Sequence, residues 1–140
     1  MALTRKKVLL AKKEDTYGTD PTAVATNAIQ VTNVEVTPIE SDNVEPASFQ
    51  GFIGNSTRST LVANKRVSIS FDVELGGSGA AGTAPAFGPL LEACGMIETP
   101  VSGTSVTYAP DATPTDSVTI CSYYDGSLHK ITGARGTVTF

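Results

Sequence analysis

Glycines at fixed spacing are the residues of this chain that most invite a chemical interpretation. Residues 77–82 read GSGAAG, which matches the G-x-G-x-x-G pattern of dinucleotide-binding loops. In such loops the glycines let the backbone approach a pyrophosphate, which then sits at a helix N-terminus. A mobile connection between two elements would use the same glycines for backbone freedom. The flanking segments must decide between the two interpretations.

Those flanking segments favour the connection. Residues 66–75 (RVSISFDVEL) alternate apolar and polar side chains, which predicts a half-buried antiparallel strand, whereas a dinucleotide loop follows a buried parallel strand. The predicted helix, about 86–94 with Gly95 as its cap, begins several residues after Gly82. No Gly-Lys-Ser/Thr follows, so this is not a P-loop. We therefore expect a loop that becomes ordered against a neighbouring subunit, and no cofactor.

Residue types that carry catalysis are sparse elsewhere. His129 is the only histidine and is predicted on a strand surface after a hairpin turn. Asp72 and Glu74 share the wet face of their strand, where acid–base work or cation binding is possible but solvation or a subunit contact suffices. Cys94 and Cys121 have neither metal-ligand spacing nor a base beside them in sequence. The prediction is a protein that is not an enzyme and has no metal site.

Charge is distributed unevenly along the chain. The net charge is −4, but residues 1–14 hold five basic groups and only Glu14, while residues 15–140 hold 5 basic and 13 acidic groups. A basic arm can bind nucleic acid, yet no aromatic side chain lies among these charges, and the acidic remainder would repel phosphates. A solvated or partner-docking N-terminus is the preferred interpretation. No apolar run approaches the roughly 20 residues of a membrane span, and the N-terminus lacks a signal-peptide core, so synthesis in the cytoplasm is expected.

The elements that must position these residues are mostly strands. Residues 29–37 alternate with a slip at Asn33, which predicts a strand with a β-bulge that ends at Pro38. Residues 39–65 predict a long loop or loose hairpin, and Asp125-Gly126 predicts a type I′ hairpin turn. Further strands are predicted at 104–110, 117–124, 128–132 and 136–140.

The fold class follows from these elements. At 140 residues the chain is expected to form one β-rich domain, 1–140, with residues 1–28 as a partly extended N-terminal arm. We expect a mainly β protein, either an antiparallel β-sandwich or a small β-barrel, with one short flanking α-helix at about 86–94. Aromatics are 6% and charged residues 17%, against roughly 25% charged in an average domain, which suits a surface covered by neighbours.

Three blocks of the chain resemble tail tube proteins of long-tailed bacteriophages and prophages. They are residues 12–42 (KKEDTYGTDPTAVATNAIQVTNVEVTPIESD), 71–96 (FDVELGGSGAAGTAPAFGPLLEACGM) and 128–140 (LHKITGARGTVTF). The second block is the most specific because it is long and unusual in composition. Members of the family are usually longer than this chain.

The resemblance implies a virion structural protein that assembles with itself, in hexameric rings that stack into a tube for DNA passage, and with other virion proteins. A capsid decoration or cement protein, and a ligand-binding β-module, stay open as alternatives. No membrane or small-molecule partner is implied. The assembly contacts expected on this interpretation are Arg5, Lys6, Lys7, Lys12, Lys13, Phe49, Phe52, Ile53, Gly77, Gly79 and Gly82.

Overall fold

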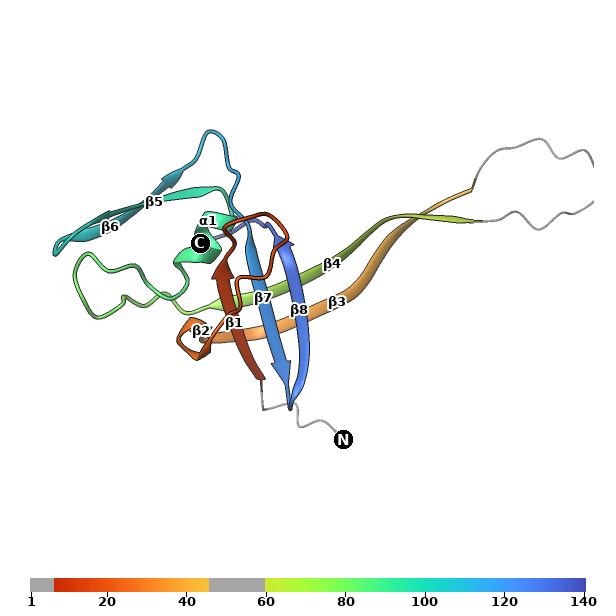
Figure 1. The fold of residues 1–140 in the computed structure, drawn as a ribbon, viewed down its shortest axis with the longest axis horizontal. Coiled ribbons are helices and arrows are strands. Elements are labelled where there is room, and N and C mark those ends of the chain that lie inside the picture. The colour runs from red at the N-terminus through yellow and green to blue at the C-terminus, as the bar shows by residue number, and fades with distance from the viewer. Residues whose placement is uncertain (1–6, 46–59) are drawn as a thin grey trace, which may run out of the picture. The chain divides into compact units, whose positions relative to one another are not determined.

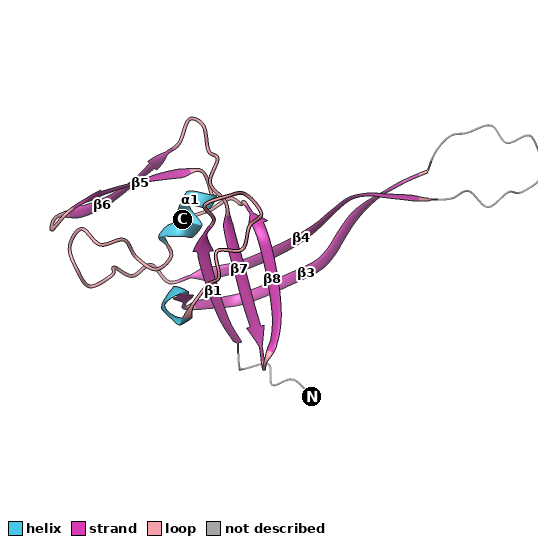
Figure 2. Cartoon of the chain, viewed as in Figure 1, coloured by secondary structure: helices cyan, strands magenta, loops and turns pink. Residues whose placement is uncertain are grey.

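The computed structural model describes residues 7–45 and 60–140 of the chain (Figure 1). It is mainly β with one short α-helix, as the sequence predicted (Figure 2). The described strands form a four-stranded sheet and two two-stranded sheets, and these sheets are not closed into a barrel. The chain divides into two compact units, of which the second is Asn33–Phe71.

The first unit is built on the four-stranded sheet, whose order is β2-β1-β7-β8. Its strands are β1 (Lys7–Lys13), β2 (Ala28–Ile29), β7 (Val118–Tyr124) and β8 (Ser127–Ala134), and a 3-10 turn at Ala25–Asn27 precedes β2. Neighbouring strands of this sheet are antiparallel, with Leu9 opposite both Ile29 and Ser122. Most buried apolar residues belong to this sheet: Leu9, Leu10, Ala11, Ile29, Val118, Ile120 and Cys121.

Strand β1 corrects the expectation of a solvated or docking N-terminal arm for residues 7–13. These residues lie between β2 and β7 in the sheet, and Leu9, Leu10 and Ala11 are buried. The apolar run is only four residues long and shows no alternation, because a central strand is covered on both faces. A short apolar run between lysines is therefore part of the core.

The β7–β8 hairpin confirms the turn predicted at Asp125-Gly126. Asp125 has φ +45° and Gly126 has φ +89°, which are type I′ values, and Tyr124 pairs with Ser127. Further along, the register shifts between Val118 and Ile120, which marks a β-bulge. Gly133 lies at this irregularity with φ +66°.

The helix and a second hairpin complete the first unit. Helix α1 spans Gly88–Ala93, shorter than the predicted 86–94, with proline in its first turn and Gly95 beyond its end at φ +85°. Leu91 and Ala93 are its buried apolar residues. Strand β5 (Met96–Val101) follows directly and pairs antiparallel with β6 (Ser105–Pro110). The sequence predicted β6 and not β5.

The second unit is formed from a long two-stranded ribbon. Strand β3 (Val31–Val44) has 14 residues and β4 (Leu61–Val73) has 13, and the two are hydrogen-bonded to each other. The predicted stop at Pro38 is wrong. Of the two forms predicted for residues 39–65, a long loop or a loose hairpin, the structure bears out the hairpin, whose strands reach Val44 and begin again at Leu61. A ribbon has open edges, so a proline that lacks an amide hydrogen is tolerated there.

The predicted strand 136–140 is also wrong. The chain leaves β8 at Ala134, and the amide of Gly136 donates to the Ala93 carbonyl at the end of α1, 3.2 Å away. Figure 1 shows the C-terminus beside this helix. Alternating Val and Thr residues form a strand only where a partner edge is free, and here the backbone caps a helix instead.

Candidate functional site

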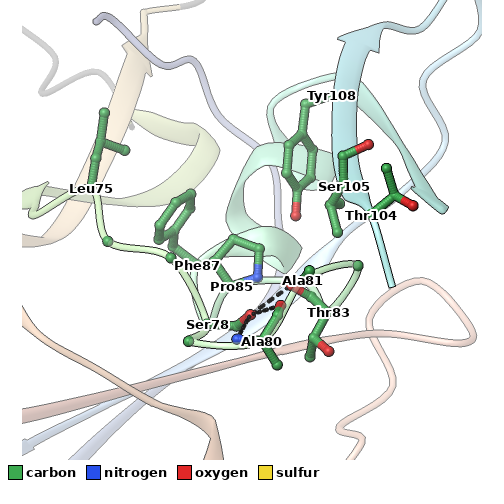
Figure 3. Close-up of a pocket in the computed structure, with 15 residues that line it drawn as sticks. Leu75, Ser78, Ala80, Ala81, Thr83, Pro85, Phe87, Thr104, Ser105 and Tyr108 are labelled. Atoms are coloured by element: carbon green, nitrogen blue, oxygen red, sulfur yellow. Dashed lines mark hydrogen bonds between the residues drawn. The ribbon is translucent and has the colours of Figure 1, made fainter. Parts of the chain in front are cut away.

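The glycine-rich loop lines an open hollow of about 560 Å³ in the first unit (Figure 3). One side of the hollow is the loop itself, from Leu75 to Thr83, and the other is β6 with the turn before it. Pro85, Phe87 and Tyr108 also line it, and Figure 3 shows the Tyr108 ring extending from β6 toward the loop. No charged side chain belongs to this lining, which is unusual in a chain with 14 acidic residues.

The loop has hydrogen bonds of its own. Ser78 Oγ lies 2.8 Å from the Thr83 carbonyl and 3.0 Å from the Ala80 carbonyl, and the Thr83 amide donates to Ala80 O at 3.3 Å. Figure 3 draws the Ser78 contacts as dashed lines. The loop therefore has contacts within its own chain, and its further ordering against a neighbouring subunit stays a prediction.

The three glycines singled out in the sequence differ in their surroundings. Gly82 has φ +74°, and a Cβ there would lie 2.4 Å from Val101 O and 2.5 Å from Gly103 N, so the loop touches the β5–β6 turn at Gly82. Gly79 has φ +83° but open space around it, and Gly77 has open space and no positive φ. Gly82 is needed for a close approach, Gly79 for a backbone conformation, and Gly77 for neither.

The start of α1 is packed against a half-buried tyrosine–glutamate pair. The Tyr108 hydroxyl donates to Glu98 Oε2 at 2.6 Å, and a Cβ at Gly88 would lie 2.7 Å from that hydroxyl. Burial raises the pKa of Tyr108, and the carboxylates of Glu98 and Glu92 raise it further. Tyr108 thus stays a neutral hydrogen-bond donor that fixes β5, β6 and α1 together at one side of the hollow.

The predicted basic contacts at Lys12 and Lys13 are used within the chain. Lys13 Nζ lies 2.7 Å from Glu92 Oε1 on α1 and 3.0 Å from Asp116 Oδ2. Burial opposes the charge, but these two carboxylates raise the pKa of Lys13. Lys12 Nζ donates to the Pro21 carbonyl at 2.9 Å.

Lys7 has an intramolecular contact as well. Its ammonium lies 5.1 Å from the centroid of the Tyr124 ring, within the range of a cation–π interaction. Among the expected assembly contacts, Arg5, Lys6, Phe49, Phe52 and Ile53 lie outside the described residues.

A buried carboxylate that the sequence did not single out joins four segments. Glu14 is 6% exposed, and its two oxygens accept hydrogen bonds from two hydroxyls and two backbone amides. The donors are Ser117 Oγ at 2.6 Å, Thr119 Oγ1 at 2.6 Å, Gly133 N at 2.7 Å and Gly18 N at 2.8 Å.

The electrostatics of Glu14 follow from these donors. Burial alone would raise the pKa of its carboxyl, but the hydrogen bonds from Gly133, Ser117, Thr119 and Gly18 lower it to about 2. The group is therefore ionised at neutral pH without a cation beside it in this set of contacts. Three of its four partners are 103 or more positions away: Ser117 just before β7, Thr119 in β7 and Gly133 in β8. No local pattern reveals these three, and the only signal is two hydroxyls at alternate positions, Ser117 and Thr119.

The β3–β4 ribbon presents apolar side chains to solvent along its length. Ile39 is 76% exposed and Leu61 57%, and three valines are also exposed: Val44, Val62 and Val67. Polar contacts link the strands, since Arg66 Nε lies 2.8 Å from Glu40 Oε2 and Asn64 Nδ2 donates to Asp42 Oδ2 at 3.0 Å. A two-stranded ribbon with this much exposed apolar surface is a candidate interaction surface.

Candidate chemistry elsewhere is limited in the part of the chain that the structure describes. His129 is exposed on β8 with its ring 5.4 Å from that of Tyr124, and both cysteines are free thiols. Within residues 7–45 and 60–140, no three His, Cys, Asp or Glu side chains are grouped as metal ligands would be, and no helix is long and apolar enough to span a membrane. Comparison with protein families, curated proteins and solved structures finds no match to this chain.

Proposed function

We propose that this chain is a bacteriophage virion structural protein, a tail tube subunit that assembles with itself into rings or tubes. The observation that carries the proposal is the β3–β4 ribbon, whose strands of 14 and 13 residues expose apolar side chains. A two-stranded hairpin by itself is marginally stable in water, so a ribbon of this length calls for a partner. The resemblance of residues 12–42, 71–96 and 128–140 to tail tube proteins supplies the kind of partner, namely further copies of the same chain.

The ribbon suits such an assembly in two ways. Each strand of a two-stranded ribbon has one edge with unpaired backbone amides and carbonyls, which neighbouring copies can cover by continuing the sheet. Burial of Ile39 and Leu61 between copies would also contribute about 1.5–3 kcal/mol for each side chain. The acidic residues of the chain are compatible with a lumen that lets DNA pass without adhering.

Electron microscopy and sedimentation velocity of the purified full chain at high concentration test the proposal. We expect rings or tubes for the natural sequence and their loss in Ile39→Lys, which places a charge on the ribbon without disturbing the core of the first unit. Thr99→Lys, at an exposed position on β5, is the matched control and should assemble normally. A sample that stays monomeric at every concentration contradicts the proposal, and binding to empty heads but not to tails would favour a capsid decoration protein.

A further inference from the structure

We infer that the uncharged hollow beside the glycine-rich loop receives residues 46–57 of a second copy of this chain. The inference rests on the proposed function and names the surface by which one copy would contact the next. It has three parts: the chemistry of the hollow, the sequence of its occupant, and the distance between the two along a single chain.

The hollow is the first part. Its 15 lining residues carry no charge, and Leu75, Pro85, Phe87 and Val106 supply apolar surface. The chain outside residues 1–14 has 13 acidic against 5 basic groups, so these parts of two copies carry net charges of the same sign, which repel each other. An uncharged hollow is a place where two copies can meet without bringing like charges together.

The occupant is the second part. Residues 46–57 (PASFQGFIGNST) connect β3 to β4 and contain no charged residue, although Glu45 and Arg58 flank them. This connection lies outside the described residues, so only its sequence enters the argument. Phe49, Phe52 and Ile53 are the large apolar side chains of the segment, and the hollow offers aromatic and aliphatic surface for such side chains.

The third part is the distance along the chain between the connection and the hollow, which favours a second copy as the source of the segment. The hollow begins at Leu75, just past the end of β4 at Val73, whereas the connection joins β4 at its other end, Leu61. A strand of 13 residues is about 40 Å long at about 3.3 Å per residue. From Leu61 back to Ile53 the chain spans at most about 27 Å when fully extended. A segment that runs back along β4 therefore stops about 13 Å short of Val73, whereas the same segment of a second copy has no such limit, and for this reason we assign the hollow to a second copy.

Photocrosslinking tests the contact directly. The photoreactive residue p-benzoylphenylalanine replaces Phe52 in the full chain, and this protein is mixed with a 15N-labelled natural copy, irradiated and mapped by mass spectrometry. We expect labelled peptides from 75–87 and 104–108. The same residue at Tyr17, an exposed aromatic outside the hollow, is the control and should not label those peptides. Crosslinks from position 52 to any other surface, including residues 136–140, or only to its own copy, overturn the inference.

A substitution inside the hollow gives an independent readout. Ala81 is exposed and lines the hollow, so Ala81→Arg should leave the subunit folded and weaken association by about tenfold or more, because the arriving apolar segment would bury an unpaired charge. Thr99→Arg, exposed and outside the lining, should associate normally. Rings or tubes formed equally well by Ala81→Arg overturn this inference and leave the proposed function standing. If the natural chain never associates, the proposed function is wrong. If irradiation then also gives no crosslink between copies, the inference about the hollow is wrong as well.

Discussion

The backbone nitrogen of Gly133 lies 2.7 Å from Oε1 of Glu14, which joins the end of β8 to the residue that follows β1. The contact depends on the bulge, because Gly133 with φ +66° turns its amide out of the strand ladder. Any side chain at 133 would also meet the Tyr17 ring, whose nearest atom would lie 3.1 Å from a Cβ. Together with the donors at Gly18 and at the start of β7, four segments of the first unit thus meet at one carboxylate.

Replacement of Glu14 by glutamine should destabilise the first unit by about 2–3 kcal/mol at pH 7. Glutamine has the shape of glutamate, but its amide group would place a donor against two of the four donors that surround the site. The measurement is urea unfolding. Asp15→Asn changes an exposed carboxylate one position away and should stay within about 0.5 kcal/mol of the natural chain. Equal stability of the two variants would show that the Glu14 contacts contribute nothing net.

The pH dependence of this stabilisation has a definite sign. The pKa of Glu14 is about 2 in the folded chain against an ordinary value of 4.5, so its stabilisation is fully present above pH 4.5 and is lost as the pH falls toward 2. The gap in unfolding free energy between the natural chain and Glu14→Gln should therefore narrow between pH 5 and pH 2. A gap that stays constant over this range would mean that the carboxylate charge is not what the four donors stabilise.

Sequence patterns predicted the elements whose signals are local. Asp125-Gly126 predicted the turn and its pairing, because a type I′ turn requires positive φ at both positions and this pair of residues adopts it readily. Strand β1 was missed because a central strand covered on both faces loses the alternation that identifies an exposed strand. Residues 136–140 have strand-like alternation, yet the Gly136 amide bonds to the end of α1. Strand formation depends on a free partner edge, which no single segment encodes.

The candidate sites, too, were predictable where the signal is local and not where it depends on contacts between distant segments. The glycine-rich loop was recognisable from its composition, but which glycine is sterically required depends on the β5–β6 turn, some 20 positions away, that Gly82 touches. Lys12 and Lys13 were interpreted as free for a partner because their acceptors, at Pro21, Glu92 and Asp116, are set by the fold. Charge alone does not reveal whether a lysine is already paired.

Replacement of Gly77, Gly79 or Gly82 by alanine should lower the free energy of unfolding by amounts that increase in that order. Gly77→Ala should be neutral, since a Cβ there meets nothing and φ is not positive. Gly79→Ala should cost about 1 kcal/mol for the left-handed conformation. Gly82→Ala should cost more, about 2–3 kcal/mol, because it adds overlap with Val101 O to the same strain. Urea unfolding measures the series, and a Gly82 variant no worse than the Gly79 variant would contradict the close approach.

Lys13→Met should destabilise the first unit by about 1 kcal/mol, a value limited by the partial exposure of the ammonium. Methionine keeps the apolar stem and removes the charge that pairs β1 with Glu92 on α1. Because ionic screening weakens such pairs, the difference from the natural chain should shrink in 1 M salt. Lys12→Met, which loses only hydrogen bonds to the carbonyls of Pro21 and Thr22, is the control and should show little dependence on salt. Identical salt responses of the two variants would argue against the ion pair.

Amide hydrogen exchange should distinguish the β3–β4 ribbon from the four-stranded sheet by the exchange rates of their backbone amides. In the dilute subunit the amides of β3 and β4 should exchange quickly, because the ribbon has open edges and exposed side chains such as Ile39 and Leu61. Amides of β7, buried between β1 and β8, should exchange slowly in the same sample. On assembly the ribbon amides should gain protection of about tenfold or more while β7 changes little, because the ribbon acquires a new partner and β7 does not. Slow exchange of the ribbon in a verified monomer would show that the ribbon is stable without a partner, and the main argument for self-assembly would then fail.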